Sequence, residues 1–165
     1  MRKELLDGIF YEKPSPLINH ARIIQNIMRI FAGYPSCQGE LSFDDKNAPI
    51  PDIVVGEADL IVEIISPATV KRDRVYKKEL YERYGIKEYW IVDDEKLAVE
   101  VYRLVGGKYE LRDIFVLLPD YETAGMTEEE LALYPTKFET PLFGGLTIDL
   151  KDIFNEVYEN VHERS

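Results

Sequence analysis

Three charged residues stand at positions where their surroundings predict apolar side chains. Glu63 lies in the middle of the run LIVEII (60–65), and Lys77 lies on the apolar side of the helix predicted after it. Asp52 stands near the head of the neighbouring run IPDIVVG (50–56). A charge in such surroundings is costly unless a partner or a metal ion accompanies it. We therefore expect Asp52, Glu63 and Lys77 to converge on one pocket.

Such a pocket suits a particular chemistry. Two neighbouring carboxylates repel each other and favour the binding of a divalent cation. Mg²⁺ is commonly held by one or two carboxylates together with waters and phosphate oxygens. A lysine beside it can stabilise the negative charge that develops on phosphorus. The trio predicts metal-assisted hydrolysis of a phosphodiester, with Mg²⁺ or Mn²⁺ as cofactor and with Asp52 and Glu63 as ligands.

Two predicted strands would position the carboxylates. The run 60–65 is apolar at nearly every other position, so both of its faces should be covered. Side chains alternate along a strand, so Glu63 shares one face with Ile61 and Ile65. A tight connection at 56–58 predicts a hairpin with the run 50–56. That pairing would place Asp52 close to Glu63.

A helix predicted over 69–84 would position the lysine. At 100° per residue, Asp73 and Lys77 fall on the packing side with several tyrosines, while Arg74 and Lys78 fall on the solvent side. A second interpretation is that Lys77 extends along those tyrosines and pairs only with Asp73, four residues earlier. Asp73 either orients Lys77 or caps the first helical turn.

The remaining elements define the fold class. They are a hairpin turning at Asp7-Gly8, a helix over 16–33, a strand within 37–44, an antiparallel meander of strands 88–93, 97–104 and 109–116, an edge strand at 146–150, and an amphipathic helix over 151–162. This order predicts an α+β fold with α/β-like features, in which helices flank a mixed sheet. We expect a single domain over 1–165, with 119–145 an excursion or a lid.

Composition and charge limit the partners. The sequence is 45% hydrophobic and 31% charged, which is typical of a globular protein, and no apolar run approaches a membrane span. The lone Cys37 fits a cytoplasmic location. A net charge of −11 argues against broad, non-specific binding of nucleic acid. A basic cluster beside the predicted site either contacts phosphates or forms a solvated helix face: Lys71, Arg72, Arg74 and Lys78.

Several stretches together resemble a known family. They are PD at 51–52, VEIISPAT at 62–69, RDRVYKKELYERYGIKEYWIVD at 72–93 and VEVYRL at 99–104. Over roughly residues 4–105 the chain is similar to the Uma2 family, grouped with restriction endonucleases in the PD-(D/E)xK nuclease superfamily. That superfamily usually has a lysine two residues after the glutamate, where this sequence has Ile65. In Uma2-like sequences the lysine lies on the next helix, which matches Lys77.

The resemblance implies a restriction-endonuclease-like core and a Mg²⁺-dependent endodeoxyribonuclease. It assigns Asp52 and Glu63 as metal ligands and Lys77 as the catalytic cation. Glu4 and His20 also match family positions. Glu4 is then a further ligand or a solvated residue, and His20 has a metal role or makes a structural hydrogen bond near the start of its helix.

The resemblance also implies partners. We expect DNA as the substrate, a homodimer or a higher homo-oligomer as the assembly, and no membrane partner. The alternative is a non-catalytic protein-interaction or metal-binding module on a nuclease fold. The acidic surface and the aromatic-rich meander favour that alternative. A glycosidase-like carboxylate pair would leave Lys77 unexplained.

Overall fold

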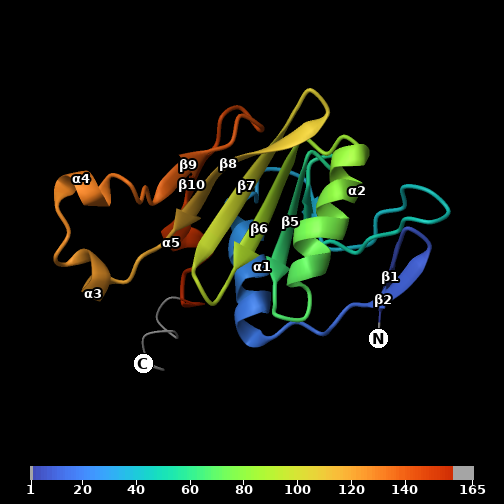
Figure 1. Ribbon diagram of the computed structural model, residues 1–165, viewed down its shortest axis with the longest axis horizontal. Coiled ribbons are helices and arrows are strands. Elements are labelled where there is room, and N and C mark those ends of the chain that lie inside the picture. Colours follow the sequence, from blue (N-terminus) through green and yellow to red (C-terminus); the bar gives the residue numbers. More distant parts are fainter. Residues whose placement is uncertain (1, 158–165) are drawn as a thin grey trace.

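The computed structural model describes residues 2–157, and its centre is a six-stranded mixed sheet (Figure 1). The sheet order is β3 (Ser36–Cys37), β4 (Ile53–Val55), β5 (Leu60–Ile65), β6 (Glu88–Asp93), β7 (Ala98–Val105) and β8 (Lys108–Val116). All neighbouring strands are antiparallel except β5 and β6. A parallel pair needs a crossover connection. Here the crossover is helical, formed by η1 (Arg72–Lys77) and α2 (Lys78–Arg83).

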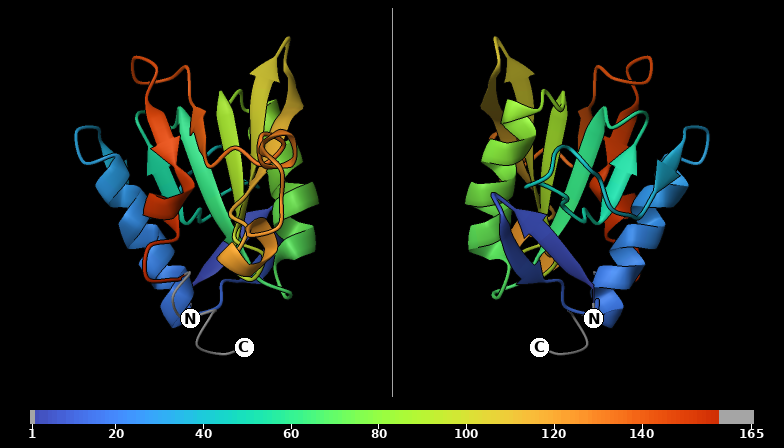
Figure 2. Two further views of the ribbon diagram at one scale, coloured as in Figure 1. Left: turned by 90° about the vertical axis from the view of Figure 1, so that its left-hand side faces the viewer. Right: turned by 90° about the vertical axis from the view of Figure 1, so that its right-hand side faces the viewer.

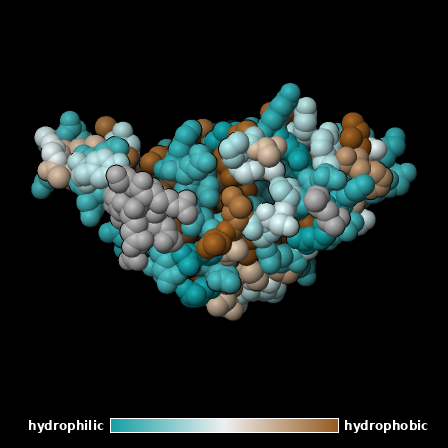
Figure 3. Space-filling view, turned by 90° about the horizontal axis from the view of Figure 1, so that it is seen from below, coloured by the Kyte–Doolittle hydropathy of each residue, from teal (hydrophilic) through white to brown (hydrophobic). Residues whose placement is uncertain are grey.

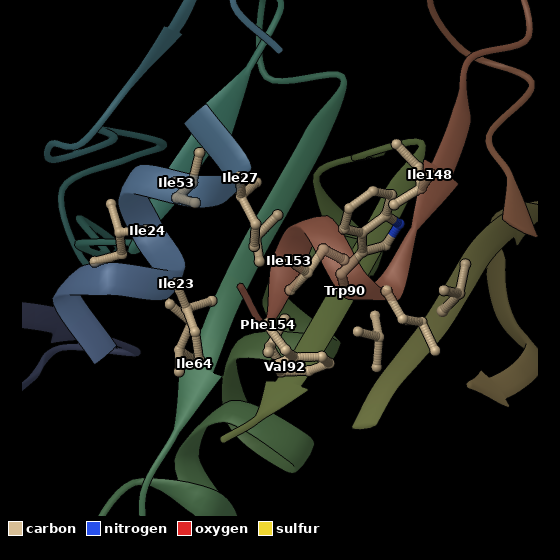
Figure 4. Packing of buried hydrophobic residues seen from close by; sticks show 14 of the residues in the cluster. Ile23, Ile24, Ile27, Ile53, Ile64, Trp90, Val92, Ile148, Ile153 and Phe154 are labelled. Atoms are coloured by element: carbon tan, nitrogen blue, oxygen red, sulfur yellow. The ribbon is translucent and has the colours of Figure 1, made fainter. Parts of the chain in front are cut away.

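One face of the sheet carries the larger hydrophobic core. Helix α1 (Ile18–Ile30) covers this face, and α2 covers the other (Figure 2). Ile23 and Ile27 of α1 pack with Ile64, Trp90 and other residues of the sheet (Figure 4). The same cluster includes residues of three C-terminal elements: β9 (Lys137–Glu139), β10 (Thr147–Asp149) and α5 (Leu150–Ile153). Burial of these apolar groups stabilises the sheet and fixes its orientation against α1.

The opposite face carries a smaller cluster beneath α2. Tyr81 of α2 packs with Ile61 and Ile65 of β5 and with Tyr89 and Ile91 of β6. Strand β5 is therefore buried on both faces, as its continuous apolar run predicts. Because side chains alternate, Glu63 falls on the α2 face, between Ile61 and Ile65.

A β-hairpin lies beside α2, apart from the main sheet (Figure 1). It consists of β1 (Lys3–Leu6) and β2 (Ile9–Glu12), joined at Asp7 and Gly8, whose φ angles are 47° and 79°. Positive φ at both central residues is the signature of a tight two-residue hairpin turn. A backbone pairing of Leu5 with Ala48 docks the hairpin. The chain then passes below β5 in Figure 1 on its way to α1.

The short helices α3 (Asp120–Thr123) and α4 (Glu128–Leu131) stand away from the sheet (Figure 1). Helix α4 begins with a capping box, in which Thr127 and Glu130 exchange backbone-to-side-chain hydrogen bonds. After α4 the chain returns to the body as β9 and β10. Among the residues that the structure describes, no helix is long and apolar enough to cross a membrane.

The α+β class with a mixed sheet flanked by helices is confirmed, and four element predictions need correction. The strand expected within 37–44 is reduced to β3, because Leu41 and Phe43 bond instead to backbone carbonyls of 47–49. The strand at 146–150 pairs with β9 and does not extend the main sheet. The predicted helix 69–84 is wound as a π-helix over η1. The predicted helix 151–162 is seen only as α5, and its part beyond 157 lies outside the described residues.

Candidate active site

A pocket of about 290 Å³ opens at the carboxyl end of β5. Seven parts of the chain contribute to its wall: β1, the segment 13–17, the start of α1, the residue before β4, β5 with the loop after it, η1, and the turn after β6. The sequence-predicted residues Asp52, Glu63 and Lys77 all line it. None of the described residues between 119 and 145 does.

Lys77 is the most deeply placed cation of this pocket. Only 1% of the residue is exposed. Its Nζ lies 2.8 Å from Glu63 Oε1, 2.8 Å from Glu4 Oε2 and 3.8 Å from Asp73 Oδ1. Burial by itself lowers the pKa of Lys77, but the surrounding carboxylates outweigh it and raise the pKa above its ordinary value. Lys77 therefore stays protonated and does not extend outward to solvent.

The π-wound segment η1 carries both Asp73 and Lys77 into the interior. Such wide helical turns are uncommon and are found frequently at functional sites. The hydroxyl of Tyr89 donates a hydrogen bond of 2.7 Å to the backbone carbonyl of Asp73, which anchors the turn on β6. The Asp73 side chain faces Lys77 and also hydrogen-bonds the side chain of Thr69. The position of Asp73 beside Lys77 fits the orienting role, whereas the start of η1 has no side-chain cap hydrogen bond.

Glu63 is held by two donors from the crossover. Its Oε1 accepts from Lys77 Nζ at 2.8 Å and from the Tyr81 hydroxyl at 2.8 Å. Its Oε2 lies 3.8 Å from Lys13 Nζ. Burial raises the pKa of Glu63 above its ordinary value, and the nearby acids Asp73 and Asp52 add to this, although both lysines oppose it. A further positive charge at Oε2 would favour the ionised form.

Asp52 reaches the same pocket from the strand beside β5. The register pairs Ile53 with Val62, so Asp52 lies level with Glu63 at the end of the β4–β5 hairpin. Its Oδ2 accepts the backbone N–H of Ile64 at 2.8 Å, which ties it to β5. Its Oδ1 lies 3.2 Å from His20 Nε2. Burial alone raises the pKa of Asp52, but the His20 hydrogen bond and the Lys13 charge outweigh it and hold the pKa below its ordinary value.

Lys13 enters from the segment between β2 and α1. Its Nζ lies 2.9 Å from Asp52 Oδ1 and donates to the backbone carbonyl of Ile50 at 2.6 Å. The sequence offers no signal for this residue, because a lysine before Pro14 in a connecting segment looks like an ordinary surface lysine. Only the path of the segment across the end of the sheet reveals it.

Glu4 is buried, so its solvated alternative is wrong. Only 1% of Glu4 is exposed. Its Oε1 accepts from Arg72 at 2.9 Å, and its Oε2 accepts from the Ile50 N–H at 3.1 Å and pairs with Lys77. Burial raises the pKa of Glu4, but Lys77 and Arg72 outweigh it, and the pKa falls below its ordinary value. Glu4 thus acts as the second counter-ion of Lys77.

Comparison with known proteins identifies the family of this chain. The family model of Uma2, described as "Putative restriction endonuclease", matches residues 1–133. The chain belongs to the Uma2 family. The match includes all the side chains of the pocket described above, and it extends beyond the stretch whose motifs resemble the family.

A solved structure shares the Uma2 fold of this chain. It is the crystal structure of "a putative nuclease belonging to DUF820" from Anabaena variabilis ATCC 29413. The two are 18% identical, with a TM-score of 0.64 over 94% of this chain and 90% of that chain. At this identity the likeness supports the fold. No curated protein matches the chain.

The Uma2 chain departs from the usual PD-(D/E)xK spacing in a way that the fold explains. Ile65, at the usual lysine position, is buried in the cluster beneath α2. Lys77 brings an ammonium group to the same glutamate from the crossover helix. The Lys77 ammonium and the Glu63 carboxylate therefore lie 2.8 Å apart, although the lysine follows the glutamate by 14 residues and not by two.

The four predicted phosphate-contacting residues have different surroundings. Arg72 is part of the pocket, where it bonds Glu4 and lies 5.0 Å from the centroid of the Tyr11 ring. Arg74 pairs with Glu100 on β7, with Nε 3.0 Å from Oε1. Lys78 lies over the ring of Tyr102, 4.5 Å from its centroid. Lys71 is exposed, 5.9 Å from the centroid of the Tyr76 ring.

The pocket fits a divalent cation in its charge and its donor atoms. Four buried carboxylates line it, those of Glu4, Asp52, Glu63 and Asp73. Three positively charged side chains lie beside them, those of Lys13, Arg72 and Lys77. The ammonium beside Asp52 and Glu63 shows that the space between them accepts a cation. Within residues 2–157, no group of three or more His, Cys, Asp or Glu forms a metal-ligand set. An ion held by Asp52 and Glu63 would therefore keep positions for water and phosphate.

Proposed function

We propose that this Uma2 protein is a divalent-metal-dependent endonuclease that hydrolyses phosphodiester bonds of DNA, with Mg²⁺ or Mn²⁺ as its cofactor. The observation that carries the proposal is the buried Lys77 ammonium, 2.8 Å from Glu63, in the pocket that Asp52 also enters. The family description supports the same class of reaction. A simple surface ion pair would not need a buried acid on each of two adjacent strands.

Each residue has a distinct role in this proposal. Asp52 and Glu63 would hold the ion, which when bound supplies positive charge to phosphate oxygens. Lys77 is a fixed positive charge and not a proton donor, because its raised pKa keeps it protonated. That charge stabilises negative charge developing on the phosphate. Tyr81, Glu4 and Asp73 position the Glu63–Lys77 pair.

The substrate would approach along the exposed side of the crossover. Lys71 is exposed on this side, Lys78 is half-buried over Tyr102, and Arg72 lies at the pocket wall. Contacts of this kind position a nucleic acid by its backbone and carry no sequence information. The acidic remainder of the molecule would disfavour binding elsewhere, so the proposal is one of local contact at the pocket.

Purified protein incubated with plasmid and with single-stranded DNA, in the presence of Mg²⁺ or Mn²⁺, tests the proposal. Asp52→Asn and Glu63→Gln are near-isosteric and should lower the cleavage rate by about 100-fold or more. Glu88→Gln is the matched control: Glu88 is also a buried strand acid, but it bonds Trp90 and Thr140 outside the pocket. Circular dichroism checks that each variant is folded. Equal cleavage by the wild type, Asp52→Asn and Glu63→Gln would overturn the proposal.

The second candidate is a non-catalytic binding module on the same fold. The engagement of Arg72 and Arg74 by carboxylates, together with the net charge of −11, favours it. Binding of Mn²⁺ that depends on Asp52, without cleavage of either DNA by the wild type, would select this candidate.

A further inference from the structure

Lys13 occupies the space that the two proposed metal ligands share. Its Nζ lies 2.9 Å from Asp52 Oδ1 and 3.8 Å from Glu63 Oε2, and 13% of its side chain is exposed. It comes from the connecting segment between β2 and α1 and not from the sheet or the crossover. The pocket wall therefore contains a cation on a separate piece of chain.

The hydrogen bonds of Asp52 and Glu63 show which of their oxygens face Lys13. Asp52 Oδ2 is used by the Ile64 N–H, and Glu63 Oε1 is used by Lys77 and Tyr81. These bonds hold the two side chains on the strands and the crossover. The oxygens that these bonds leave are Asp52 Oδ1 and Glu63 Oε2. Lys13 faces both of them, and His20 Nε2 also lies 3.2 Å from Asp52 Oδ1.

An ion and the ammonium cannot share these oxygens at short range. Like charges at such separations repel strongly, and repulsion is weakly screened at a buried site. Of the two lysines near Glu63, Lys13 is better able to leave, since it is more exposed than Lys77 and opens onto the pocket. Its backbone lies between a hairpin and a helix, outside the sheet and the crossover that hold Asp52, Glu63 and Lys77.

We propose that Lys13 is a tethered cation that holds the Asp52–Glu63 pair in the metal-free protein and is displaced when a divalent ion binds. This inference rests on the proposed function. Lys13 thereby raises the ion concentration at which the site fills. It also keeps two buried acids compensated while the ion is absent.

The test is a titration of the protein with Mn²⁺ alone. Calorimetry and the electron paramagnetic resonance signal of free Mn²⁺ both measure the binding. Lys13→Met should bind Mn²⁺ on the order of 10-fold more tightly than the wild type. Lys87→Met is the matched control, because it removes the same charge from an ion pair with Asp59, 2.7 Å in length and outside the pocket. It should change the affinity less than about 2-fold. Asp52→Asn should abolish Mn²⁺ binding in the wild type and in Lys13→Met.

A second readout does not depend on affinity. Without ions, Lys13→Met should melt at a lower temperature than the wild type, because Asp52 and Glu63 lose their shared cation. Saturating Mn²⁺ should then raise the melting temperature of Lys13→Met by more than that of the wild type. If Lys13→Met does not fold, Lys13→Gln replaces it, since its amide can still donate to the Ile50 carbonyl. Lys13→Arg keeps the charge and should bind Mn²⁺ no more tightly than the wild type.

The outcomes separate this inference from the proposed function. Asp52-dependent Mn²⁺ binding that is equally tight in the wild type, Lys13→Met and Lys87→Met overturns the role of Lys13 and leaves the nuclease proposal standing. Absence of Mn²⁺ binding in both the wild type and Lys13→Met overturns both. Binding by Lys13→Met alone supports displacement most directly.

Discussion

At the scale of single residues, the site is a set of buried charges that compensate one another. Lys77 is the most dependent on this compensation, because three carboxylates surround its ammonium group. Removing one partner of a buried ion pair is far more costly than the pair's net contribution, since the remaining charges stay desolvated.

We expect Lys77→Met to lower the free energy of unfolding by about 3–5 kcal/mol. The reason is that Glu4 and Glu63 would stay buried without their shared cation. Lys87→Met, which breaks an exposed pair with Asp59, should cost less than about 1 kcal/mol. Urea unfolding followed by circular dichroism measures both. Similar losses in the two variants would show that Lys77 is not the counter-ion described here.

Two buried tyrosines allow a finer comparison. The Tyr81 hydroxyl donates to the Glu63 carboxylate at 2.8 Å, and the Tyr89 hydroxyl donates to a backbone carbonyl at 2.7 Å. Hydrogen bonds to charged groups contribute about 1.5–3 kcal/mol and neutral ones about 0.5–1.5 kcal/mol. We therefore expect Tyr81→Phe to destabilise the protein more than Tyr89→Phe in urea unfolding. The expectation holds if Glu63 is ionised beside Lys77; the reverse order would indicate the neutral form, towards which burial shifts the pKa of Glu63.

At the scale of elements, a second buried acid joins the sheet to the C-terminal segment. Glu88 at the start of β6 accepts from Trp90 Nε1 at 2.7 Å and from the Thr140 hydroxyl at 2.8 Å. Burial raises its pKa above the ordinary value of 4.5, although both hydrogen bonds and Arg103 oppose the change. The folded protein consequently binds this proton more tightly than the unfolded chain does.

The pH dependence follows from that sign. The contribution of Glu88 to stability is fully present below its ordinary pKa and is lost as the pH rises through the raised value. We expect the free energy of unfolding of the wild type to fall relative to that of Glu88→Gln as the pH rises from about 4 to 7. The fall should be about 1.4 kcal/mol for each tenfold increase in proton affinity of Glu88 on folding. Urea unfolding of both proteins at several pH values measures the difference. A constant difference would mean that the pKa of Glu88 is not raised.

At the scale of the whole molecule, charge is distributed unevenly. The chain carries a net charge of −11, yet residues 71–83 beside the pocket carry five basic residues at 71, 72, 74, 78 and 83, besides the buried Lys77. Figure 3 shows a mostly hydrophilic lower face with a small group of hydrophobic residues near its middle. A polyanion would be attracted to the crossover and repelled by most of the remaining surface.

Salt dependence should identify the phosphate contacts. If Lys71 meets a phosphate, Lys71→Ala should weaken DNA binding similarly for all sequences and reduce the slope of log K against log salt by about 1. Lys108→Ala, at the start of β8 and paired with Glu82, is the control and should leave the slope unchanged. Fluorescence anisotropy with labelled DNA at several salt concentrations measures both. Equal slopes for all three proteins would remove Lys71 from the interface.

Assembly is also decided at this scale. Leu131 is 40% exposed and Leu133 is 76% exposed, at the end of α4 and just beyond it, in the segment that stands away from the sheet. Exposed apolar side chains of this kind often become buried between protein chains. We expect a homodimer, and Leu133→Asp should shift the mass in sedimentation velocity to that of the 19.1 kDa monomer. A wild type that sediments as a monomer at all concentrations would refute this expectation.

The sequence alone determined the features that depend on local periodicity. Alternation along β5 places Glu63 with Ile61 and Ile65, and helical spacing turns Asp73 and Lys77 inward. These patterns repeat over a few residues, so they are readable without knowing where the rest of the chain lies. The family motifs are equally local.

Only the tertiary structure determined which distant groups meet these residues. Lys13 and Asp52 are 39 positions apart, and Arg72 and Glu4 are 68 apart. Neither contact leaves a trace in local spacing, because each depends on the path of the segment 13–17 and on the docking of the β1–β2 hairpin. The physical reason is that periodicity specifies the direction of a side chain relative to its own element. The packing of elements then decides which partner lies in that direction.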